Sequence, residues 1–254
     1  MKNAHLWRAL GRNTIISIIL FGALLGLLWL AELMIPSMQG KLLQFANAAW
    51  VVGIPASIIG VAYILTIKDP SNYTGFYAGL IMSVLLGTQF ILQGGYDSAF
   101  LFFCVFIPFQ IKSILNWSKP AESNAEPFSP EFLGWKGMLL SVLTMLVITF
   151  ADYVLATYVF QHNSLADNVA IKLFNGLLIS SSVLANFWLI YRKTDSWLYW
   201  FLYSAAGIGL FIILGNIFSI VLFVFFLVIN SMAGIAWIKG TKPENMGWLR
   251  RSRN

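Results

Sequence analysis

Long apolar runs, separated by short polar or charged stretches, dominate the chain. Because a helix needs about 20 mostly apolar residues to cross the hydrocarbon core of a bilayer, each run of that length predicts one membrane-spanning helix. Eight such runs occur, covering roughly residues 14–35, 46–67, 73–93, 97–116, 136–160, 167–191, 196–212 and 215–237. The first run is longer than the apolar core of a signal peptide, so we expect it to be a retained helix.

Composition supports an all-α integral membrane protein. The 254 residues are 59% hydrophobic and only 10% charged, against about a quarter charged in soluble domains. A net charge of +6 could suggest nucleic-acid binding, but the basic residues lie between apolar runs, so we expect the lipid bilayer and no nucleic acid as a partner. With only Cys104, His5 and His162 available, we expect no disulfide, no metal site and no cofactor.

The distribution of basic residues predicts the topology. In an eight-helix arrangement, every Lys and Arg except Lys41 and Lys172 falls on the side that holds the N-terminus. Since cytoplasmic loops are enriched in Lys and Arg, both termini are predicted to be cytoplasmic. The polar stretch "NWSKPAESNAEPFSPEFLGWK" (116–136) is then a cytoplasmic linker between two halves.

The two halves repeat a pattern. In "AYILTIKDPSNYTGFYAGLIM" (62–82) and in "FWLIYRKTDSWLYWFLYSA" (187–205), a basic residue, Asp and Ser precede an aromatic residue that opens the next helix. The third helices close with "ILNWSK" (114–119) and "GIAWIK" (234–239). We therefore expect one extra helix (1–40), a three-helix repeat (41–119), a linker with a connecting helix (120–162), a parallel second repeat (163–240) and a basic tail (241–254).

This plan resembles that of the SWEET sugar transporters, and two motifs are similar to those of PnuC-type vitamin transporters. The motifs are "SNYTGFYAGLI" (71–81) and "DSWLYW" (195–200), the second of which contains a W-x-x-W. The resemblance implies a facilitator of nicotinamide riboside uptake in a bacterial cytoplasmic (inner) membrane, with a cytosolic kinase trapping the vitamin and a homotrimer as assembly. Similar relatives carry thiamine or other vitamins, so thiamine and riboflavin remain alternatives.

Candidate substrate-binding residues come from the polar and aromatic groups inside the apolar runs. Buried amides in a bilayer are costly and should face the bundle interior or a wet cavity. Two of them lie seven residues before the closing Trp of each repeat and should face each other near the membrane midplane; interhelical hydrogen bonding is the alternative. The candidates are Trp197, Trp200, Tyr203, Ser204, Gln110, Asn230, Asn186 and Gln89.

The two tryptophans in the first turns of the predicted helix 196–212 allow two interpretations. Trp197, near Arg192 and Lys193, is predicted to contribute to the interfacial aromatic belt. Trp200 is one turn deeper and is predicted to hold a flat ring, with Gly207 leaving room for it. In two other helices, Pro55 and Pro108 predict either hinges or static kinks.

The scarcity of charged residues within the predicted spans limits the classes of ligand and of protein function. Asp152 is the one charged residue that we place well inside a span, and a structural role is favoured over a proton or cation relay. The ligand should therefore be uncharged or carry a delocalised charge, as nicotinamide riboside does. A membrane enzyme would need acid, base or metal ligands within the spans, and a receptor subunit would need a cytoplasmic signalling domain, so both are weaker alternatives.

Overall fold

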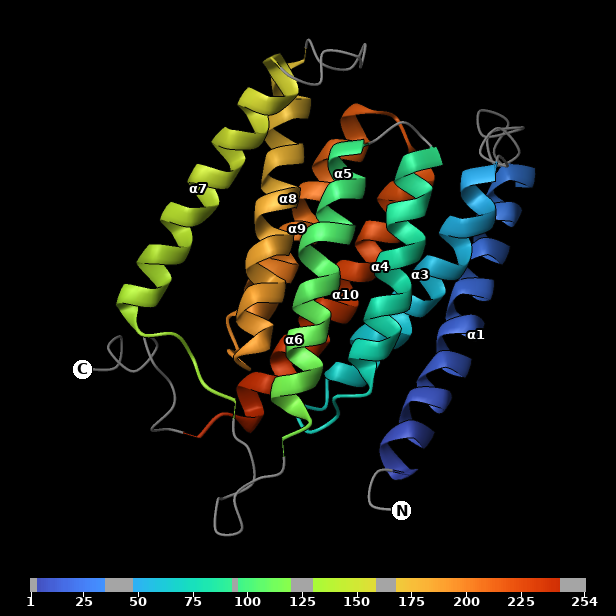
Figure 1. Ribbon diagram of the computed structural model, residues 1–254. Coiled ribbons are helices and arrows are strands. Elements are labelled where there is room, and N and C mark those ends of the chain that lie inside the picture. Colours follow the sequence, from blue (N-terminus) through green and yellow to red (C-terminus); the bar gives the residue numbers. More distant parts are fainter. Residues whose placement is uncertain (1–3, 35–47, 93–95, 120–129, 159–167, 243–254) are drawn as a thin grey trace. The chain divides into compact units, whose positions relative to one another are not determined.

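The computed structural model describes residues 4–34, 48–92, 96–119, 130–158 and 168–242. These residues are mostly helical (Figure 1). The exceptions are turns and the segment 130–134, in which Glu131 forms an isolated β-bridge with Lys193. Residues 120–129 of the predicted linker and 243–254 of the predicted tail (241–254) lie outside the described residues, so no further account of those residues follows.

Helices are found where the apolar runs predict them. They are α1 (Ala4–Met34), α3 (Ala48–Ile67), α4 (Gly75–Leu92), a continuous helix made of α5 (Tyr96–Leu101), η2 (Phe102–Phe106) and α6 (Ile107–Trp117), then α7 (Trp135–Tyr158), α8 (Val169–Ile190), α9 (Ser196–Ile213) and α10 (Ile217–Gly240). Seven of them are long and apolar enough to cross a membrane; the described apolar part of α3, Val51–Ile67, is shorter. The chain is thus an all-helical membrane protein, and α3 as an eighth span stays a prediction.

The largest error in the predicted bounds concerns α1, which begins at Ala4 and not at residue 14. Apolar runs mark only the part of a helix that suits lipid, whereas the first turns of α1 are stabilised by polar contacts. The Leu6 carbonyl accepts hydrogen bonds from Asn72 Nδ2 (3.5 Å) and Thr74 Oγ1 (3.2 Å). Two turns further on, Asn13 Nδ2 donates to Thr66 Oγ1 (3.0 Å). The other helix ends differ from the prediction by at most three residues, as fraying ends usually do.

The chain forms two compact units, Met1–Pro120 and Ala121–Asn254, which we call unit 1 and unit 2 and describe separately. In unit 1, α1 packs against α3, and α4 packs against both α3 and the helix formed by α5, η2 and α6. In unit 2, α7 packs against α8, and α9 packs against both α8 and α10. The second helix of each predicted repeat is therefore in contact with the other two helices.

The third helices of the two units present the same seven-residue pattern. Phe103, Gln110 and Trp117 recur as Phe223, Asn230 and Trp237. Residues seven apart lie two turns apart on nearly one face of a helix. In both units this face packs against the second helix. The Phe103 ring lies on Gly87 and the Phe223 ring on Gly207. Trp117 contacts Phe76 edge to face, with 4.7 Å between ring centroids, and Trp237 contacts Trp197 in the same way at 5.6 Å.

One of the two predicted proline sites departs from regular helix geometry. The turn Phe102–Phe106 is π-helical, and its first carbonyl accepts a hydrogen bond from the Ile107 N–H. Pro108 follows directly and has no N–H to donate, which weakens the α-helical ladder just there. Pro55, by contrast, lies inside an α3 that stays α-helical. A wide turn thus marks the third helix of unit 1, whereas α10 is α-helical throughout.

The turn from α8 to α9 has a residue with left-handed backbone. Arg192 has φ 56°, and the N–H groups of Arg192 and Lys193 donate to the carbonyls of Leu189 (2.9 Å) and Trp188 (3.0 Å), a Schellman motif. Glycine is the usual residue at that position, as at Gly215 (φ 65°) after α9. Burial lowers the pKa of the Arg192 guanidinium, because desolvation disfavours its charge.

Candidate functional site

Aromatic residues of α9 form the first part of the site. Trp200 and Tyr203 contact each other edge to face, with 5.4 Å between ring centroids and 87° between the planes. The Tyr203 ring in turn lies 5.3 Å from that of Phe223 on α10. Trp200 is buried in unit 2, with 8% of its surface exposed. Trp200 and Tyr203, three residues apart, therefore lie on one side of α9.

Asn230 of α10 reaches this aromatic cluster. Its Nδ2 donates to Ser204 Oγ (3.1 Å) and, more weakly, to the Trp200 carbonyl (3.4 Å). Ser204 Oγ donates to the same carbonyl (3.0 Å), so the amide is oriented by two groups of α9. Asn230 is 1% exposed, and its Oδ1 has no hydrogen-bond partner among the described residues. Leaving a buried acceptor unsatisfied is costly, so this oxygen is suited to receive a donor from a bound molecule.

Trp197 differs from its predicted role. A residue of the interfacial belt exposes its ring to headgroups, but Trp197 is 3% exposed and packs edge to face on Trp237. Its Cβ also lies against Gly234, where an added methyl group would come within 3.1 Å. The belt interpretation is wrong, because distance from the basic pair Arg192-Lys193 gives depth along α9 but not the side of the helix. The Trp197 Nε1 donor is buried and has no partner among the described residues.

The space expected beside Gly207 is occupied. A Cβ atom at this position would lie 2.0 Å from the Phe223 ring, so the absent side chain makes room for that ring. The prediction that Gly207 leaves room for a ligand is therefore wrong for this structure. The spacing could have placed Phe223 on the same face of α10 as Asn230, since it lies seven residues before Asn230, but not its contact with Gly207.

Gln110 lies in unit 1 and has a different environment from Asn230. Its side chain packs on Gly79, where a Cβ would come within 2.6 Å of Gln110 Oε1, and its Nε2 donates to the hydroxyl of Tyr63 (3.4 Å). Gln110 and Tyr63 are 2% and 1% exposed. Tyr63 was not among the predicted residues, because nothing in the spacing links α3 to α6. That Gln110 and Asn230 face each other stays a prediction.

The two remaining amides lie elsewhere. Gln89, on α4 of unit 1, packs against Gly53 of α3, and its Oε1 is buried without a partner among the described residues. Asn186, on α8 of unit 2, is 3% exposed and donates from Nδ2 to the Ser182 carbonyl one turn earlier (2.9 Å). The structure thus groups Trp200, Tyr203, Ser204 and Asn230, which we call the α9–α10 cluster.

Asp152 connects two helices. Its Oδ2 accepts a hydrogen bond from Asn175 Nδ2 (3.2 Å), which joins α7 to α8. Nearby, Lys172 donates to Thr157 Oγ1 (3.0 Å) and lies over the Tyr153 ring. These contacts support the structural role that we favoured for Asp152. Among the described residues, no group of three or more His, Cys, Asp or Glu could hold a metal ion.

Long apolar helices that bury indole rings and uncharged amides are those of a multi-pass membrane protein. The family is given by sequence: residues 50–239 match a family model described as "Nicotinamide mononucleotide transporter". That match spans most of the chain, so the chain belongs to this transporter family and is not an enzyme. The resemblance indicated by "SNYTGFYAGLI" and "DSWLYW" is confirmed.

A solved structure shares the fold. It is titled "Crystal structure of the Vitamin B3 transporter PnuC" and is similar with a TM-score of 0.60 and 18% sequence identity, over 88% of this chain and 91% of that chain. At this identity the similarity establishes the fold. No curated protein matches the chain.

Proposed function

We propose that the chain carries nicotinamide riboside into the cell and that the α9–α10 cluster contributes the main contacts to its nicotinamide group. The observation that carries this proposal is the Asn230 amide, which is oriented by Ser204 beside Trp200 and keeps a buried acceptor without a partner among the described residues. Both family membership and the fold support a substrate of this vitamin's class.

The chemistry of the ligand matches these groups. The pyridinium ring carries a delocalised positive charge, which is attracted to the face of an indole such as that of Trp200. Its carboxamide N–H can donate to Asn230 Oδ1, and the ribose hydroxyls suit the remaining amides and hydroxyls. Gln110, Gln89 and Asn186 are proposed for those positions, as predicted from the sequence, and Trp197 is retained through its indole N–H, which is buried without a described partner.

The phosphate of the mononucleotide is a poorer match. Phosphate groups in proteins are usually held by Arg, Lys or several backbone N–H groups. None of the eight proposed binding residues is charged. We therefore favour the riboside over the mononucleotide, although the family takes its description from the latter.

The proposed mechanism is rocking of one three-helix repeat against the other around a substrate held near the membrane midplane. Trapping of the vitamin by a cytosolic kinase, which the PnuC resemblance implies, would make ion coupling unnecessary. With this mechanism we propose an inner-membrane location in a bacterium, cytoplasmic termini, eight spans including α3, and a homotrimer. The repeat boundaries given above form part of the same proposal.

A binding titration of the purified protein against a panel of vitamins tests the proposal. We expect nicotinamide riboside to bind more tightly than nicotinamide mononucleotide, nicotinamide, thiamine or riboflavin, measured by calorimetry in detergent. Uptake of labelled riboside into proteoliposomes should follow the same order. Tightest binding of the mononucleotide would contradict our choice of substrate, and tightest binding of thiamine or riboflavin would move the protein to another vitamin.

A further inference from the structure

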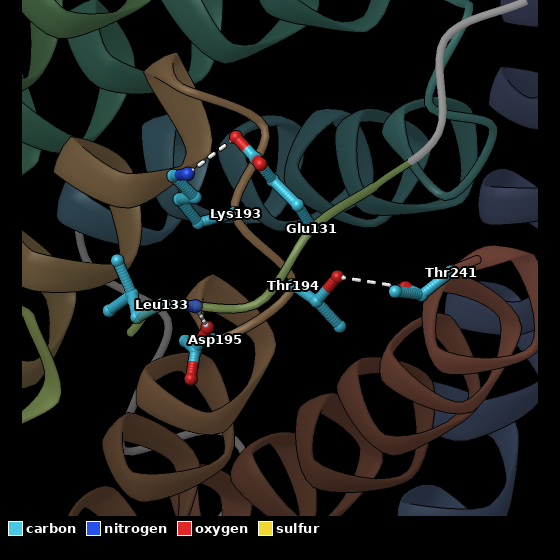
Figure 2. A network of polar contacts seen from close by, with 6 residues as sticks. All are labelled: Glu131, Leu133, Lys193, Thr194, Asp195 and Thr241. Carbon is cyan, nitrogen blue, oxygen red and sulfur yellow. Dashed lines mark hydrogen bonds and ion pairs between the residues drawn. The ribbon is translucent and has the colours of Figure 1, made fainter. Parts of the chain in front are cut away.

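Polar contacts concentrate at the turn between α8 and α9, immediately before the aromatic residues of α9. The segment 130–133, which precedes α7, runs along this turn (Figure 2). Glu131 and Lys193 form a parallel β-bridge, and the Thr194 N–H donates to the Glu131 carbonyl (2.8 Å). The side chains of Glu131 and Lys193 also form an ion pair. We call the segment 130–133 the strap.

Asp195 is the residue that receives the end of the strap. Its Oδ2 accepts a hydrogen bond from the Leu133 N–H at 2.7 Å, and Asp195 is 2% exposed. Asp195 stands at the N-cap position of α9, where an Asp side chain usually accepts from the first helical N–H groups. Here its side chain makes no such capping bond. The carboxylate is thus directed to the strap, and a hydrogen bond to a buried charged group is among the stronger ones.

Apolar and hydroxyl contacts complete the network. Phe132 and Leu133 of the strap are buried, at 8% and 4% exposed. On the other side of the turn, the hydroxyls of Thr194 and Thr241 lie 3.3 Å apart, and Thr241 Oγ1 donates to the Trp237 carbonyl (2.9 Å). The start of α9 is therefore held between the strap and the end of α10 (Figure 2).

The corresponding turn of unit 1 is held in a different way. There the Leu6 carbonyl of α1 accepts from Asn72 and Thr74, at the turn from α3 to α4. Asp69, the counterpart of Asp195 in the sequence repeat, is exposed and accepts from Ser71 within its own loop (3.0 and 2.7 Å). Each turn is thus fixed by a segment that precedes its repeat. Of the two aspartates, Asp195 accepts a hydrogen bond from that segment, whereas Asp69 accepts hydrogen bonds from its own loop.

We propose that the strap and Asp195 position α9, so that Asp195 acts as a positioning residue for the aromatic and amide groups that hold the substrate. Trp197 and Trp200 follow Asp195 within the first two turns of the helix, and the N–H groups of Leu198 and Tyr199 donate to the Asp195 carbonyl (3.0 and 3.3 Å). A shift of the turn is therefore transmitted directly to the indoles. This inference rests on the proposed function for its link to substrate, but not for the strap itself.

The test uses the full chain with Asp195→Ala, the conservative Asp195→Asn, and Asp69→Ala as the matched control. Hydrogen exchange without ligand, followed in peptides covering 130–134, 192–196 and 197–206, reports on the strap and on α9. Asp195→Ala should exchange faster in all three and should bind nicotinamide riboside about tenfold more weakly or worse, the loss expected for one strong buried hydrogen bond. Asp195→Asn keeps an acceptor and should recover most of both properties, and Asp69→Ala should behave as the parent.

Three results would overturn the proposal: unchanged exchange of 130–134 in Asp195→Ala, faster exchange of the strap with unchanged exchange of 197–206, or a released strap with parental affinity. Equal losses in Asp69→Ala would count against it as well, because they would point to a general effect of loop aspartates. If the parent binds no nicotinamide riboside, the proposed function fails, while the exchange data still decide whether the strap positions α9.

Discussion

Asn230 shows how one side chain can be both fixed and available. Its amide nitrogen is used by Ser204 and by the Trp200 carbonyl, which sets the direction of Oδ1. A flexible amide would lose entropy on binding, whereas an oriented one has already lost it. The Asn230 side chain therefore has little conformational freedom, and its Oδ1 has no partner among the described residues. Both properties favour a ligand that donates a hydrogen bond.

We expect Asn230→Ala to weaken binding of nicotinamide riboside by about 1–3 kcal/mol, because the ligand's donor would be left unsatisfied in a buried site. Gln110→Ala should have a loss in the same range if it binds the substrate. Calorimetric titration measures both. Ser231→Ala is the matched control, since the Ser231 hydroxyl donates to the Leu227 carbonyl of its own helix. Parental affinity in both amide variants would mean that these groups are structural.

The two indoles of α9 should respond differently to truncation. Trp200→Ala should reduce affinity by about 1–3 kcal/mol, the value of stacking a flat ring on an aromatic side chain, while the protein still folds. Trp200→Phe should keep part of this affinity.

Trp197→Ala removes the partner of Trp237 in a buried contact and should lower the unfolding temperature more than Trp200→Ala does. Thermal unfolding and titration of both variants separate the effects. Unchanged binding in Trp200→Ala would refute the prediction that Trp200 holds the flat ring of the substrate.

At the scale of helices, packing in each unit depends on glycine positions that accept a phenyl ring from the third helix. Gly207 receives Phe223 and Gly87 receives Phe103. In a bilayer, helix association depends on close packing more than on the hydrophobic effect, because lipid tails are as apolar as the side chains. These two contacts are therefore expected to matter for stability.

Gly207→Ala should destabilise the protein by about 1–3 kcal/mol, since its Cβ would lie 2.0 Å from the Phe223 ring. Adding Phe223→Leu in the same chain should recover part of the loss, giving a non-additive pair in thermal unfolding. Gly22→Ala on α1 provides the control, because nothing lies within 4 Å of the place that its added methyl group would take and alanine favours the helix. A Gly207→Ala variant as stable as the parent would show that α9 and α10 adjust without cost.

The sequence predicts elements better than it predicts the site. Apolar length identifies the helices because lipid imposes it. The seven-residue spacing before Trp117 and Trp237 selects Gln110 and Asn230, which the structure buries, whereas their facing each other and their contact with substrate stay predictions. Spacing along one helix, however, carries no information on its neighbour. The burial of Trp197 on Trp237, the Phe223 ring on Gly207 and the Tyr63 partner of Gln110 all depend on contacts between helices, so they required the structure.

At the scale of the whole molecule, the asymmetry of Lys and Arg predicts orientation. Single cysteines placed in the 120–130 linker and in the C-terminal tail, in a Cys104→Ala background, should react with a membrane-impermeant reagent only from the cytoplasmic side. Residues 120–129 and 243–254 lie outside the described residues, so this prediction rests on the distribution of Lys and Arg. Labelling of either position from outside would contradict cytoplasmic placement of both termini and the eight-span arrangement.

The coupling of transport to ions is a second property of the whole molecule. Asp152, the charged residue predicted well inside a span, is bonded to Asn175, which supports a role in joining α7 to α8. We therefore expect binding and uptake of nicotinamide riboside to be independent of sodium, with a response to membrane potential set only by the ligand's own charge. Uptake into proteoliposomes with and without a sodium gradient measures this. A steep sodium dependence would instead make Asp152 a candidate for ion coupling.

The strap also has a consequence for the order in which the protein can mature. Its residues leave the ribosome well before those that they bind: 62 residues separate Leu133 from Asp195, and a further 47 separate Thr194 from Thr241. Helices α7 and α8 are therefore synthesised before the residues that bind the strap exist. The whole network can form only after Thr241, which follows α10, has been synthesised, because the Thr194 hydroxyl contacts it.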